Sequence, residues 1–478
     1  MSSKPKLHPV RVKKKPKKEI DPGKIYKEKG KGFLLETKEL ESDRINYSLL
    51  SIECNDKIQI NQNNTKVTGP ILEEQVTETD ELNNKNPVNR IKSIFNQINV
   101  YNPTFPRFAG GIVGYFSFET IHQISNKLKE KNLNHPLAEF YFPKKFLKYN
   151  HSTNELSLIK YLKDPDKTQI KSNRRKLSQE LQEIESMQQK QLKHKKIEIN
   201  KINSNYSQKE YEDIVEKAKR YIQEGETYQI VLSRRIDIPV QVDPLELYFN
   251  LRKVNPSSYL YHLDFDERKI IGSSPEMLVR SSGNKVETVP IAGTISRGRN
   301  KVEDKKLAQE LLQDPKEKSE HVMLVDLARN DLGRVSEIGS VRVKDFKRIK
   351  KFSHVQHITS KVIARLKKEK DMFDAFRSCF PAGTVSGAPK LRSIQVIDEL
   401  EKDPRGPYSG AVGYFSFNEE MDFAITIRTF HVKENEVQLQ VGAGIVKDSV
   451  PRKEWKETID KGKAGMKALR LFRGDRDE

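Results

Sequence analysis

The sequence contains few cysteines and no long apolar segment. Only Cys54 and Cys379 occur among its 478 residues, and two distant cysteines build neither a disulfide scaffold nor a cysteine-based zinc site. No apolar run reaches the roughly 18 residues that a transmembrane helix needs. The basic N-terminus is not followed by the apolar segment of a secretory signal. These absences predict a soluble, cytoplasmic protein that has no membrane partner.

Common nucleotide-binding and hydrolase motifs are also absent. The sequence has no G-x-x-x-x-G-K-[ST] or G-x-G-x-x-G pattern, which would place a phosphate at a helix N-terminus. It has no G-x-S-x-G nucleophile elbow either. A nucleotide site and a serine hydrolase are therefore not indicated.

Positive charge is abundant, with 87 Lys and Arg against 67 Asp and Glu, a formal net charge of +20. Such an excess attracts polyanions by long-range steering. However, residues 1–18 hold a net charge of +8 and residues 160–201 a net charge of +6, and neither segment has the interleaved aromatic residues on which nucleic-acid bases stack. We interpret the two segments as a solvated tail and as a mobile connector or exposed helix, and we do not expect a nucleic-acid partner.

The pattern of apolar residues and turn signals changes along the chain. Short β-like runs dominate before residue 160, whereas longer alternating helices and strands follow residue 204. The sequence predicts four segments: a basic disordered tail at 1–22, an N-terminal region at 23–160, a basic polar connector at 161–203 and a catalytic domain at 204–472.

One apolar segment occurs twice. Residues 110–118 and 409–417 agree at seven of nine positions, in a glycine-rich pattern typical of a buried strand. The separation of 299 residues is too long for a solenoid repeat. We expect two related strands in two halves of one fold rather than a chance similarity.

Carboxylates recur at helical spacing in two places. Glu317 and Glu320 follow a helix start at residues 314–315, and Glu457 lies on a second helix that Pro451 begins. Two helices that present carboxylates can hold one hard cation, and Mg²⁺ suits a site that also binds an anion. By spacing alone, solvated helix faces are the commoner outcome.

Three glycine-rich segments and a histidine pair are further candidates. Residues 290–294, 382–390 and 442–444 can bring backbone N–H groups close to an anion, although ordinary turns would look the same. His354 and His357 lie on a predicted strand and would point to opposite faces of it. One of them could act as an acid or base, and a structural histidine is the commoner outcome.

Taken in order, these segments resemble the chorismate-utilising enzymes, and among them most closely the anthranilate synthase component I family. The resemblance is strong over residues 204–470 and weak over 23–160. It rests on Ser274-Pro275-Glu276 and on residues 290–294, 319–333, 382–390, 405–408 and 442–451. The resemblance implies an α+β fold of two large antiparallel β-sheets packed face to face, with helices outside. Its internal pseudo-symmetry would explain the repeated segment.

The resemblance also implies roles for individual residues. Glu320 and Glu457 would be ligands of Mg²⁺, Glu276 the general acid that helps the C4 hydroxyl of chorismate to leave, and His357 a histidine close to the reacting ring. The implied substrate contacts are Gly293, Thr294, Thr384, Tyr408, Arg428, Gly442, Ala443, Gly444 and Lys461.

Two positions bear on the product. Family members that use water carry a Lys where this chain has Gln229, and aminodeoxychorismate synthases often carry a Lys in place of Ala292. The resemblance therefore implies the large (aminase) subunit of anthranilate synthase, a lyase of tryptophan biosynthesis that converts chorismate and ammonia to anthranilate and pyruvate. The alternative is component I of aminodeoxychorismate synthase, in the folate pathway.

The resemblance further implies a partner and an inhibitor. The chain has no segment for a glutaminase, so a separate glutamine amidotransferase subunit (component II) would supply the ammonia. Residues 34–37 and 255–259 resemble the segments that bind the feedback inhibitor tryptophan in the family. The tryptophan site implied in this way contains Thr37, Asn255, Pro256 and Ser257.

Overall fold

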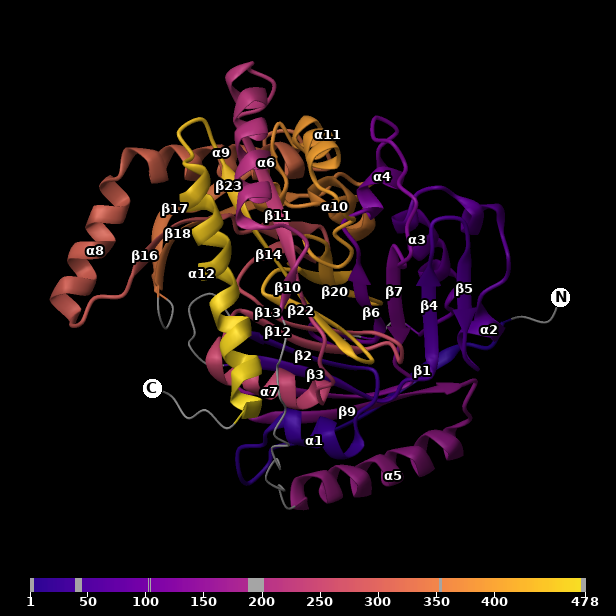
Figure 1. The fold of residues 1–478 in the computed structure, drawn as a ribbon. Coiled ribbons are helices and arrows are strands. Elements are labelled where there is room, and N and C mark those ends of the chain that lie inside the picture. The colour runs from indigo at the N-terminus through magenta and orange to yellow at the C-terminus, as the bar shows by residue number, and fades with distance from the viewer. Residues whose placement is uncertain are drawn as a thin grey trace.

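The computed structural model describes residues 4–38, 45–101, 103, 105–187, 202–351 and 355–473. Two antiparallel β-sheets form its centre, and helices lie on the outside (Figure 1). The predicted α+β fold with two large antiparallel sheets and outer helices is thus confirmed. Among the residues in these ranges, no helix is both long enough and apolar enough to cross a membrane.

The first sheet has twelve strands within the described ranges. They are β1 (Leu7–Lys14), β2 (Phe33–Lys38), β3 (Ile45–Glu53), β8 (Lys145–Asn150), β9 (Glu155–Lys163), β10 (Asn203–Ser204), β11 (Gln229–Ile238), β12 (Tyr259–Asp264), β13 (Lys269–Ser274), β19 (Gly387–Ala388), β22 (Thr429–Lys433) and β23 (Glu436–Ile445). The spatial order is β1-β9-β8-β3-β2-β12-β13-β22-β23-β11-β10, and β19 pairs with β11.

The second sheet has eleven strands in the same ranges. They are β4 (Asp56–Ile60), β5 (Thr65–Thr68), β6 (Gly111–Phe116), β7 (Ala138–Phe142), β14 (Met277–Ser282), β15 (Lys285–Thr288), β16 (Ile291–Ser296), β17 (Arg342–Lys351), β18 (Val355–Arg365), β20 (Ala411–Ser416) and β21 (Glu420–Ile425). The spatial order is β16-β18-β15-β14-β21-β20-β6-β7-β4-β5, and β17 pairs with β18.

The helices begin where the sequence supplies capping residues. They are α1 (Pro22–Lys29), α2 (Leu72–Gln75), α3 (Pro87–Gln97), α4 (Thr120–Ile124), α5 (Lys167–Ser186), α6 (Gln208–Gln223), α7 (Pro244–Val254), α8 (Lys301–Gln313), α9 (Pro315–Gly333), α10 (Met372–Cys379), α11 (Lys390–Leu400), α12 (Pro451–Arg470) and the 3₁₀ turns η1 (Asp80–Asn83), η2 (Gly383–Val385) and η3 (Leu471–Arg473). The Asp314 side chain accepts hydrogen bonds from the first amides of α9, and Pro315 opens the helix. The predicted helix starts at 314–315 and at Pro451 are confirmed.

The main hydrophobic core lies between the two sheets. It joins side chains of the first sheet, such as Phe146, to side chains of the second, such as Phe116. The Tyr259 hydroxyl on β12 donates to the Asp422 carboxylate on β21, at 2.9 Å, so a polar link also crosses this core. A second core lies under α1, α5, α7 and α12, which cover the other face of the first sheet. The two faces of this sheet thus belong to two separate cores.

The repeated segment forms two neighbouring strands. β6 and β20 pair antiparallel at the centre of the second sheet, and Gly114 lies directly opposite Gly413. A Cβ atom at Gly114 would lie 1.9 Å from the Glu139 carbonyl oxygen, and one at Gly413 would lie 2.0 Å from that of Asp422. The repetition therefore reflects a local two-fold arrangement in which both glycines allow the backbones to approach.

The prediction of a disordered tail at 1–22 is wrong for most of that segment. Residues 7–14 form β1, which pairs with β9 along its whole length. Leu7, Val10 and Val12 are buried, while the charged side chains between them face acids of neighbouring elements, as in the 2.7 Å ion pair of Arg11 with Glu155. A strand whose partner lies about 150 residues away leaves little local signal besides its charges.

Of the two alternatives for the predicted connector at 161–203, a mobile linker or an exposed helix, the structure shows the helix over residues 167–186. β9 extends to Lys163, and α5 packs Leu177, Leu181 and Ile184 into the second core. Residues 188–201 lie outside the described part of the chain. The regions 23–160 and 204–472 each give strands to both sheets, so the predicted boundaries divide the sequence but not the fold.

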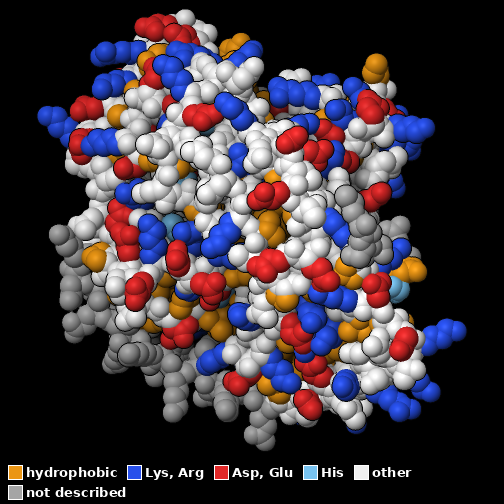
Figure 2. All heavy atoms as spheres, turned by 90° about the vertical axis from the view of Figure 1, so that its right-hand side faces the viewer, with side chains coloured by type: hydrophobic (Ala, Val, Ile, Leu, Met, Phe, Trp, Pro, Cys, Tyr) orange, Lys and Arg blue, Asp and Glu red, His pale blue; other side chains and the backbone are white. Residues whose placement is uncertain are grey.

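The positive charge is spread over the surface and mixed with acidic groups. On the face shown in Figure 2, blue Lys and Arg side chains lie among red Asp and Glu side chains rather than in one continuous basic area. Lys14 of the first basic segment pairs with Glu185 of the second, and Glu180 of the second lies 2.9 Å from Lys145. Many basic side chains are therefore paired with a nearby acidic side chain.

Removal of residues 1–18 should destabilise the protein strongly. The truncation takes Leu7, Val10 and Val12 out of the core, and each buried aliphatic side chain contributes about 1.5–3 kcal/mol. We expect a loss of at least about 4 kcal/mol in the free energy of unfolding, measured by urea denaturation. As the control, the double variant Lys13→Ala/Lys15→Ala removes charge but keeps the strand, and it should stay within about 0.5 kcal/mol of the wild type. An unchanged urea midpoint for the truncated chain would show that β1 contributes nothing.

Candidate active site

The predicted catalytic residues gather where the two sheets meet α9 and α12. Glu276 lies between β13 and β14, His357 on β18, Arg428 directly before β22, and Gly442 on β23. These elements lie in the central and left-hand parts of Figure 1, with α9 above them and α12 running down beside them. Residues that are far apart in sequence thus meet at one site.

Glu276 is a buried carboxyl with an unusual acidity. Its side chain is only 7% exposed. Burial raises its pKa to about 7, while the Thr384 hydroxyl, the positive charge of Arg428 and the backbone N–H of Ile291 oppose that rise. Near neutral pH a sizeable fraction of the group is therefore protonated and able to donate a proton, as a general acid does.

Arg428 is the charged partner of Glu276. Its backbone has a φ angle of +52°, an uncommon conformation for a residue other than glycine. Its carbonyl oxygen accepts a hydrogen bond from the Ser273 amide, which fixes the turn against β13. Burial lowers the pKa of Arg428, and the nearby Glu276 carboxylate counteracts this, but a guanidinium remains charged at neutral pH. The site thus holds a permanent cation.

His357 is held in its neutral form. Its Nδ1 lies 2.7 Å from the carbonyl oxygen of Gly293 and 3.1 Å from the Thr294 hydroxyl. Because a carbonyl oxygen only accepts, Nδ1 carries the proton. Burial, helped by the positive charge of Arg428, lowers the pKa of His357 to about 4. His354, the other candidate on this segment, lies outside the described residues.

The glycines of β23 leave the floor of the site without side chains. A Cβ atom at Gly442 would lie 2.7 Å from the Tyr408 hydroxyl, and one at Gly444 would lie 2.6 Å from Nε2 of Gln229. Ala443 between them points into the core on the other face. Lys461 on α12 donates to the Gly442 carbonyl oxygen at 2.9 Å. The backbone of Gly442 and Gly444 is therefore in contact with Tyr408, Gln229 and Lys461.

Two helices present carboxylates at one edge of the site. Glu317 and Glu320 lie on α9, and Glu454 and Glu457 lie on α12. Burial raises the pKa of Glu320, and the negative charges of Glu317, Glu457 and Glu454 raise it further. The side chain of Glu317 reaches Gly293, where a Cβ atom would meet its Oε2 at 2.9 Å. Like charges held together in this way are a favourable place for a cation.

The donor set fits Mg²⁺. Within the described ranges, no three His, Cys, Asp or Glu side chains form a ready metal site. Mg²⁺, however, is usually held by one or two carboxylates together with water and substrate oxygens. Glu320 on α9 and Glu457 on α12 could supply the two carboxylates.

Several groups that support the site were not predicted from the sequence. The Arg405 guanidinium donates to the carbonyl oxygens of Val231, at 2.6 Å, and of Val385, at 2.7 Å. The Glu119 carboxylate accepts from the backbone N–H groups of Arg405, at 2.6 Å, and of Gly406, at 3.0 Å. Arg405 lies in the motif 405–408 and could have been singled out, whereas nothing in the sequence pattern points to Glu119.

The residues of the predicted tryptophan site do not all line one cavity. Thr37 lines a partly open cavity between the two sheets, whereas Asn255, Pro256 and Ser257 are not among its lining residues. They come directly before β12, and the Ser258 carbonyl oxygen accepts from the Lys38 amide at 2.8 Å. Only part of the predicted set therefore faces the cavity.

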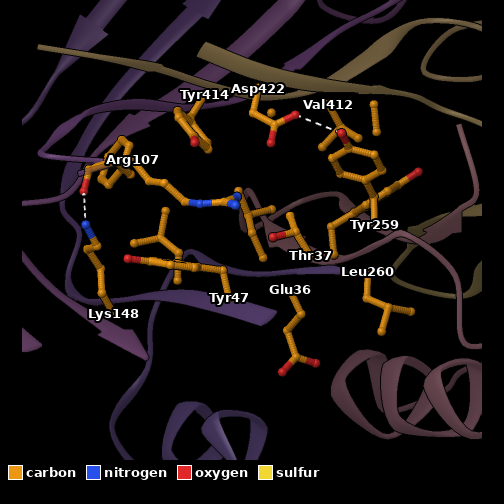
Figure 3. Close-up of a pocket in the computed structure, with 16 residues that line it drawn as sticks. Glu36, Thr37, Tyr47, Arg107, Lys148, Tyr259, Leu260, Val412, Tyr414 and Asp422 are labelled. Carbon is orange, nitrogen blue, oxygen red and sulfur yellow. Dashed lines mark hydrogen bonds between the residues drawn. The ribbon is translucent and has the colours of Figure 1, made fainter. Parts of the chain in front are cut away.

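The cavity has charged and aromatic walls that sequence reasoning missed. Figure 3 shows Tyr47, Arg107 and Lys148 at one end, Tyr259 and Asp422 at the other, and Thr37 between the two ends. Lys148 donates to the Phe108 carbonyl oxygen at 2.8 Å, and burial lowers its pKa to about 7. These side chains come from strands distant in sequence, so no local motif marks them.

A model of the chorismate binding enzyme family matches residues 32–467. The chain belongs to this family. Curated relatives named anthranilate synthase component 1 include that of Aquifex aeolicus strain VF5, 42% identical over 82% of this chain and 81% of the relative. The protein of that name from Methanothermobacter thermautotrophicus is 40% identical over 94% and 91% of the two chains.

Solved structures of the family have the same fold. Anthranilate synthase component I from Streptococcus pneumoniae TIGR4 aligns with a TM-score of 0.75 and 33% identity, over 89% of this chain and 93% of that one. The menaquinone-specific isochorismate synthase from Escherichia coli aligns with a TM-score of 0.73 over 97% and 95% of the two chains. At 18% identity, the second comparison shows the fold alone.

The raised pKa of Glu276 should make stability depend on pH. Folding raises the pKa of Glu276 from 4.5 to about 7, because the buried site favours the neutral carboxyl. The folded protein therefore has its full stability below pH 4.5 and loses part of it as the pH rises through 7. The variant Glu276→Gln cannot ionise. At pH 8 it should be more stable than the wild type by up to about 3 kcal/mol, since one pKa unit corresponds to about 1.4 kcal/mol.

Urea denaturation of both proteins at several pH values measures this difference. It should vanish near pH 4, where both side chains are neutral. As a control, the exposed Glu434 on the β22–β23 turn can be changed to Gln, which should give the wild-type pH profile. A constant difference between Glu276→Gln and the wild type from pH 4 to pH 8 would contradict a buried titrating carboxyl.

Proposed function

We propose that this chain is the aminase subunit of an anthranilate synthase. In this reaction chorismate and ammonia give anthranilate, pyruvate and water, which makes the enzyme a carbon–oxygen lyase. The observation that carries the proposal is the buried Glu276, with a pKa of about 7, beside Thr384 and Arg428. The similarity to several curated anthranilate synthase components supports it.

Binding of chorismate uses cations and backbone groups of this chain. Arg428 and Lys461 supply positive charge to a dicarboxylate, and the backbone at 442–444 lets an anion approach closely because it lacks bulky side chains. Glu320 and Glu457 would hold Mg²⁺, which supplies positive charge that neutralises a substrate carboxylate when bound. Tyr408 and the segment 293–294 would complete the walls of the chorismate site.

The first step replaces the C4 hydroxyl with an amine at C2. The ammonia lone pair forms the bond to C2, both ring double bonds shift by one position, and the bond from C4 to oxygen breaks. Hydroxide is a poor leaving group, so the proton of Glu276 passes to this oxygen and water departs. The ammonium nitrogen then loses a proton, and we assign the Glu276 carboxylate as its acceptor.

The second step makes the ring aromatic. The C2 proton leaves, its electron pair enters the ring, and the bond from C3 to the enolpyruvyl oxygen breaks, so that pyruvate forms after protonation of its methylene carbon. His357 is neutral, with the proton on Nδ1, and is the base we assign to the C2 proton. Aromatisation makes this step strongly favourable.

Two side chains set the choice of nucleophile and product. Gln229 lies against Gly444 at the floor, and it cannot activate water as a lysine could. Ala292, next to Gly293 on β16, provides no amine to attack C2. We therefore infer ammonia attack at C2 and anthranilate as the product. We also propose that a separate glutamine amidotransferase subunit supplies the ammonia and that the pair works in the cytoplasm.

A product assay tests the proposed function directly. Purified protein with chorismate, Mg²⁺ and ammonium at alkaline pH should form anthranilate and pyruvate in equal amounts, detected by fluorescence and by coupled reduction of pyruvate. No product should form without ammonium, and glutamine alone should not replace it. Formation of aminodeoxychorismate would instead assign the chain to the folate pathway.

Loss of the acid at residue 276 should remove the reaction but not substrate binding. Glu276→Gln should lower kcat by about 10²–10⁴-fold, the usual contribution of a general acid, with a smaller change in the KM for chorismate. At a fixed concentration of free ammonia, wild-type kcat should fall as the pH rises above 7, because the acid ionises. Glu434→Gln is again the matched control, and near-normal activity of Glu276→Gln would exclude Glu276 as the acid.

We also propose that tryptophan binds in the cavity between the sheets and inhibits the enzyme. The cavity combines aromatic walls with the charged groups Arg107, Lys148 and Asp422, which suits an amino acid with a large apolar side chain. Thr37→Val keeps the shape and removes a hydroxyl. It should raise the tryptophan concentration for half inhibition about fivefold, the effect of one hydrogen bond of about 1 kcal/mol.

Steady-state inhibition curves measure this effect. Thr68→Val on β5 is the control, and its inhibition curve should match the wild type. Wild-type activity that does not respond to tryptophan would refute the inhibitor proposal, and an unchanged curve for Thr37→Val would refute the role of Thr37.

A further inference from the structure

Helix α12 carries two side chains of the candidate active site but has no side-chain cap at its start. Glu457 and Lys461 lie in its first three turns. Val450, at the N-cap position, gives the first turn no side-chain hydrogen bond. The later turns pack closely on the first sheet, since a Cβ atom at Gly465 would lie 2.9 Å from Cδ2 of Leu439. A contact other than a cap must therefore orient the first turns.

Arg234 on β11 makes a contact of this kind. Its Nε donates to the Thr458 hydroxyl at 2.8 Å, and its guanidinium carbon lies 4.1 Å from the centre of the Trp455 ring. The Thr458 hydroxyl in turn donates to the Trp455 carbonyl oxygen at 2.7 Å. A second guanidinium nitrogen, Nη1, donates to the Ser204 hydroxyl at 3.3 Å. Arg234 thus holds α12 through a hydrogen bond and a cation–π contact.

The contacts of Arg234 define how α12 is rotated about its axis. Trp455 and Thr458 are three positions apart and share one face of the helix, whereas Glu457 and Lys461 are four apart and share a different face. Successive residues of an α-helix are about 100° apart around the axis. A rotation that broke the contact between Thr458 and Arg234 would therefore also move the Glu457 carboxylate.

Arg234 is a buried cation without a counter-ion. It is 5% exposed, and within the described residues the one ionisable group that acts on it is the phenol of Tyr211, whose ring packs against Trp455. Burial lowers the pKa of Arg234, but a guanidinium stays charged in a protein. A buried charge of this kind costs free energy. Its directional contacts with α12, rather than a gain in stability, explain its place in the structure.

We propose that Arg234 is a positioning residue that orients the first turns of α12 and so sets the affinity of the active site for its divalent cation and for chorismate. This inference rests on the proposed function, in which Glu457 is a ligand of Mg²⁺ and Lys461 binds chorismate. Arg234 follows Ser233, which lies opposite Gly442 of the floor. Neighbouring residues of a strand face opposite sides, so Arg234 points away from the floor and acts through α12.

Cation binding without turnover tests the proposal. Mn²⁺ is the probe for the Mg²⁺ site, chorismate is present, ammonium is omitted, and the electron paramagnetic resonance signal of free Mn²⁺ gives the Kd. Thr458→Val keeps the side-chain shape but removes the acceptor for Arg234, so it should raise this Kd about fivefold, the effect of one hydrogen bond. Arg234→Met should raise it at least about tenfold, because the cation–π contact is lost as well. Thr458→Ser retains the hydroxyl and should bind Mn²⁺ like the wild type.

Two further measurements separate positioning from a general structural role. Trp455 is the only tryptophan of the chain, so acrylamide quenching of its fluorescence reports on α12 directly. Quenching should increase in Thr458→Val and stay at the wild-type value in Thr458→Ser, since loosened first turns expose the indole. The KM for chorismate should rise in Thr458→Val, while the fall of kcat above pH 7 assigned to Glu276 should stay where it is.

A matched substitution on the neighbouring helix is the control. Arg220→Met removes the same charged group from the exposed surface of α6, which packs beside α12, and should leave the Kd for Mn²⁺ unchanged. If Arg234→Met fails to fold, the two Thr458 variants carry the test. A wild-type Kd for Mn²⁺ in Thr458→Val would overturn the proposed role of Arg234. Failure of the wild type to form anthranilate would instead overturn the proposed function and leave the comparison of Kd values valid.

Discussion

The pairing of β6 with β20 is the constraint on which the rest of the structure depends. The two strands come from opposite ends of the chain and meet with Gly114 opposite Gly413. Tyr408 comes just before β20, and β21, which follows it, leads to Arg428. The amide of Ile425 at the end of β21 donates to the Glu276 carbonyl oxygen at 3.0 Å. The position of the catalytic residues therefore follows from a contact between two glycine-containing strands.

The electrostatics of the site result from burial more than from total charge. Burial pushes Glu276 and His357 toward their neutral forms, whereas Arg428 stays charged. The resulting site combines a proton donor and a neutral imidazole with one fixed cation, whose charge acts on both. The net charge of +20 adds little to this arrangement, because basic side chains such as Arg11 and Lys145 are paired with acids far from the site. Local geometry decides what the site can bind.

The sequence allowed candidate catalytic residues to be named because family motifs carry them. Glu320 and Glu457 are 137 positions apart, and their spacing alone did not distinguish a metal site from solvated helix faces. The sheet architecture followed from the same resemblance. Strand β1 was missed because its apolar positions are few and its partner β9 is distant in sequence. Asp422 and Lys148 were missed because they contribute to a cavity that forms only when several strands pack together.

Buried ion pairs explain why the weakly matching N-terminal region is still part of the catalytic unit. Arg405 and Glu401 form a 2.6 Å pair that is almost inaccessible to water, an arrangement with a large desolvation cost. Arg405 also binds the carbonyl oxygens of Val231 and Val385, while Glu401 accepts from the Ser233 amide at 2.7 Å. Glu119, from the N-terminal region, holds the backbone of the same loop. A pair of this kind contributes little net stability, but its directional hydrogen bonds fix the loop that carries Tyr408 against β11 and η2. The N-terminal region is thereby tied to the loop that carries Tyr408, one of the candidate substrate contacts.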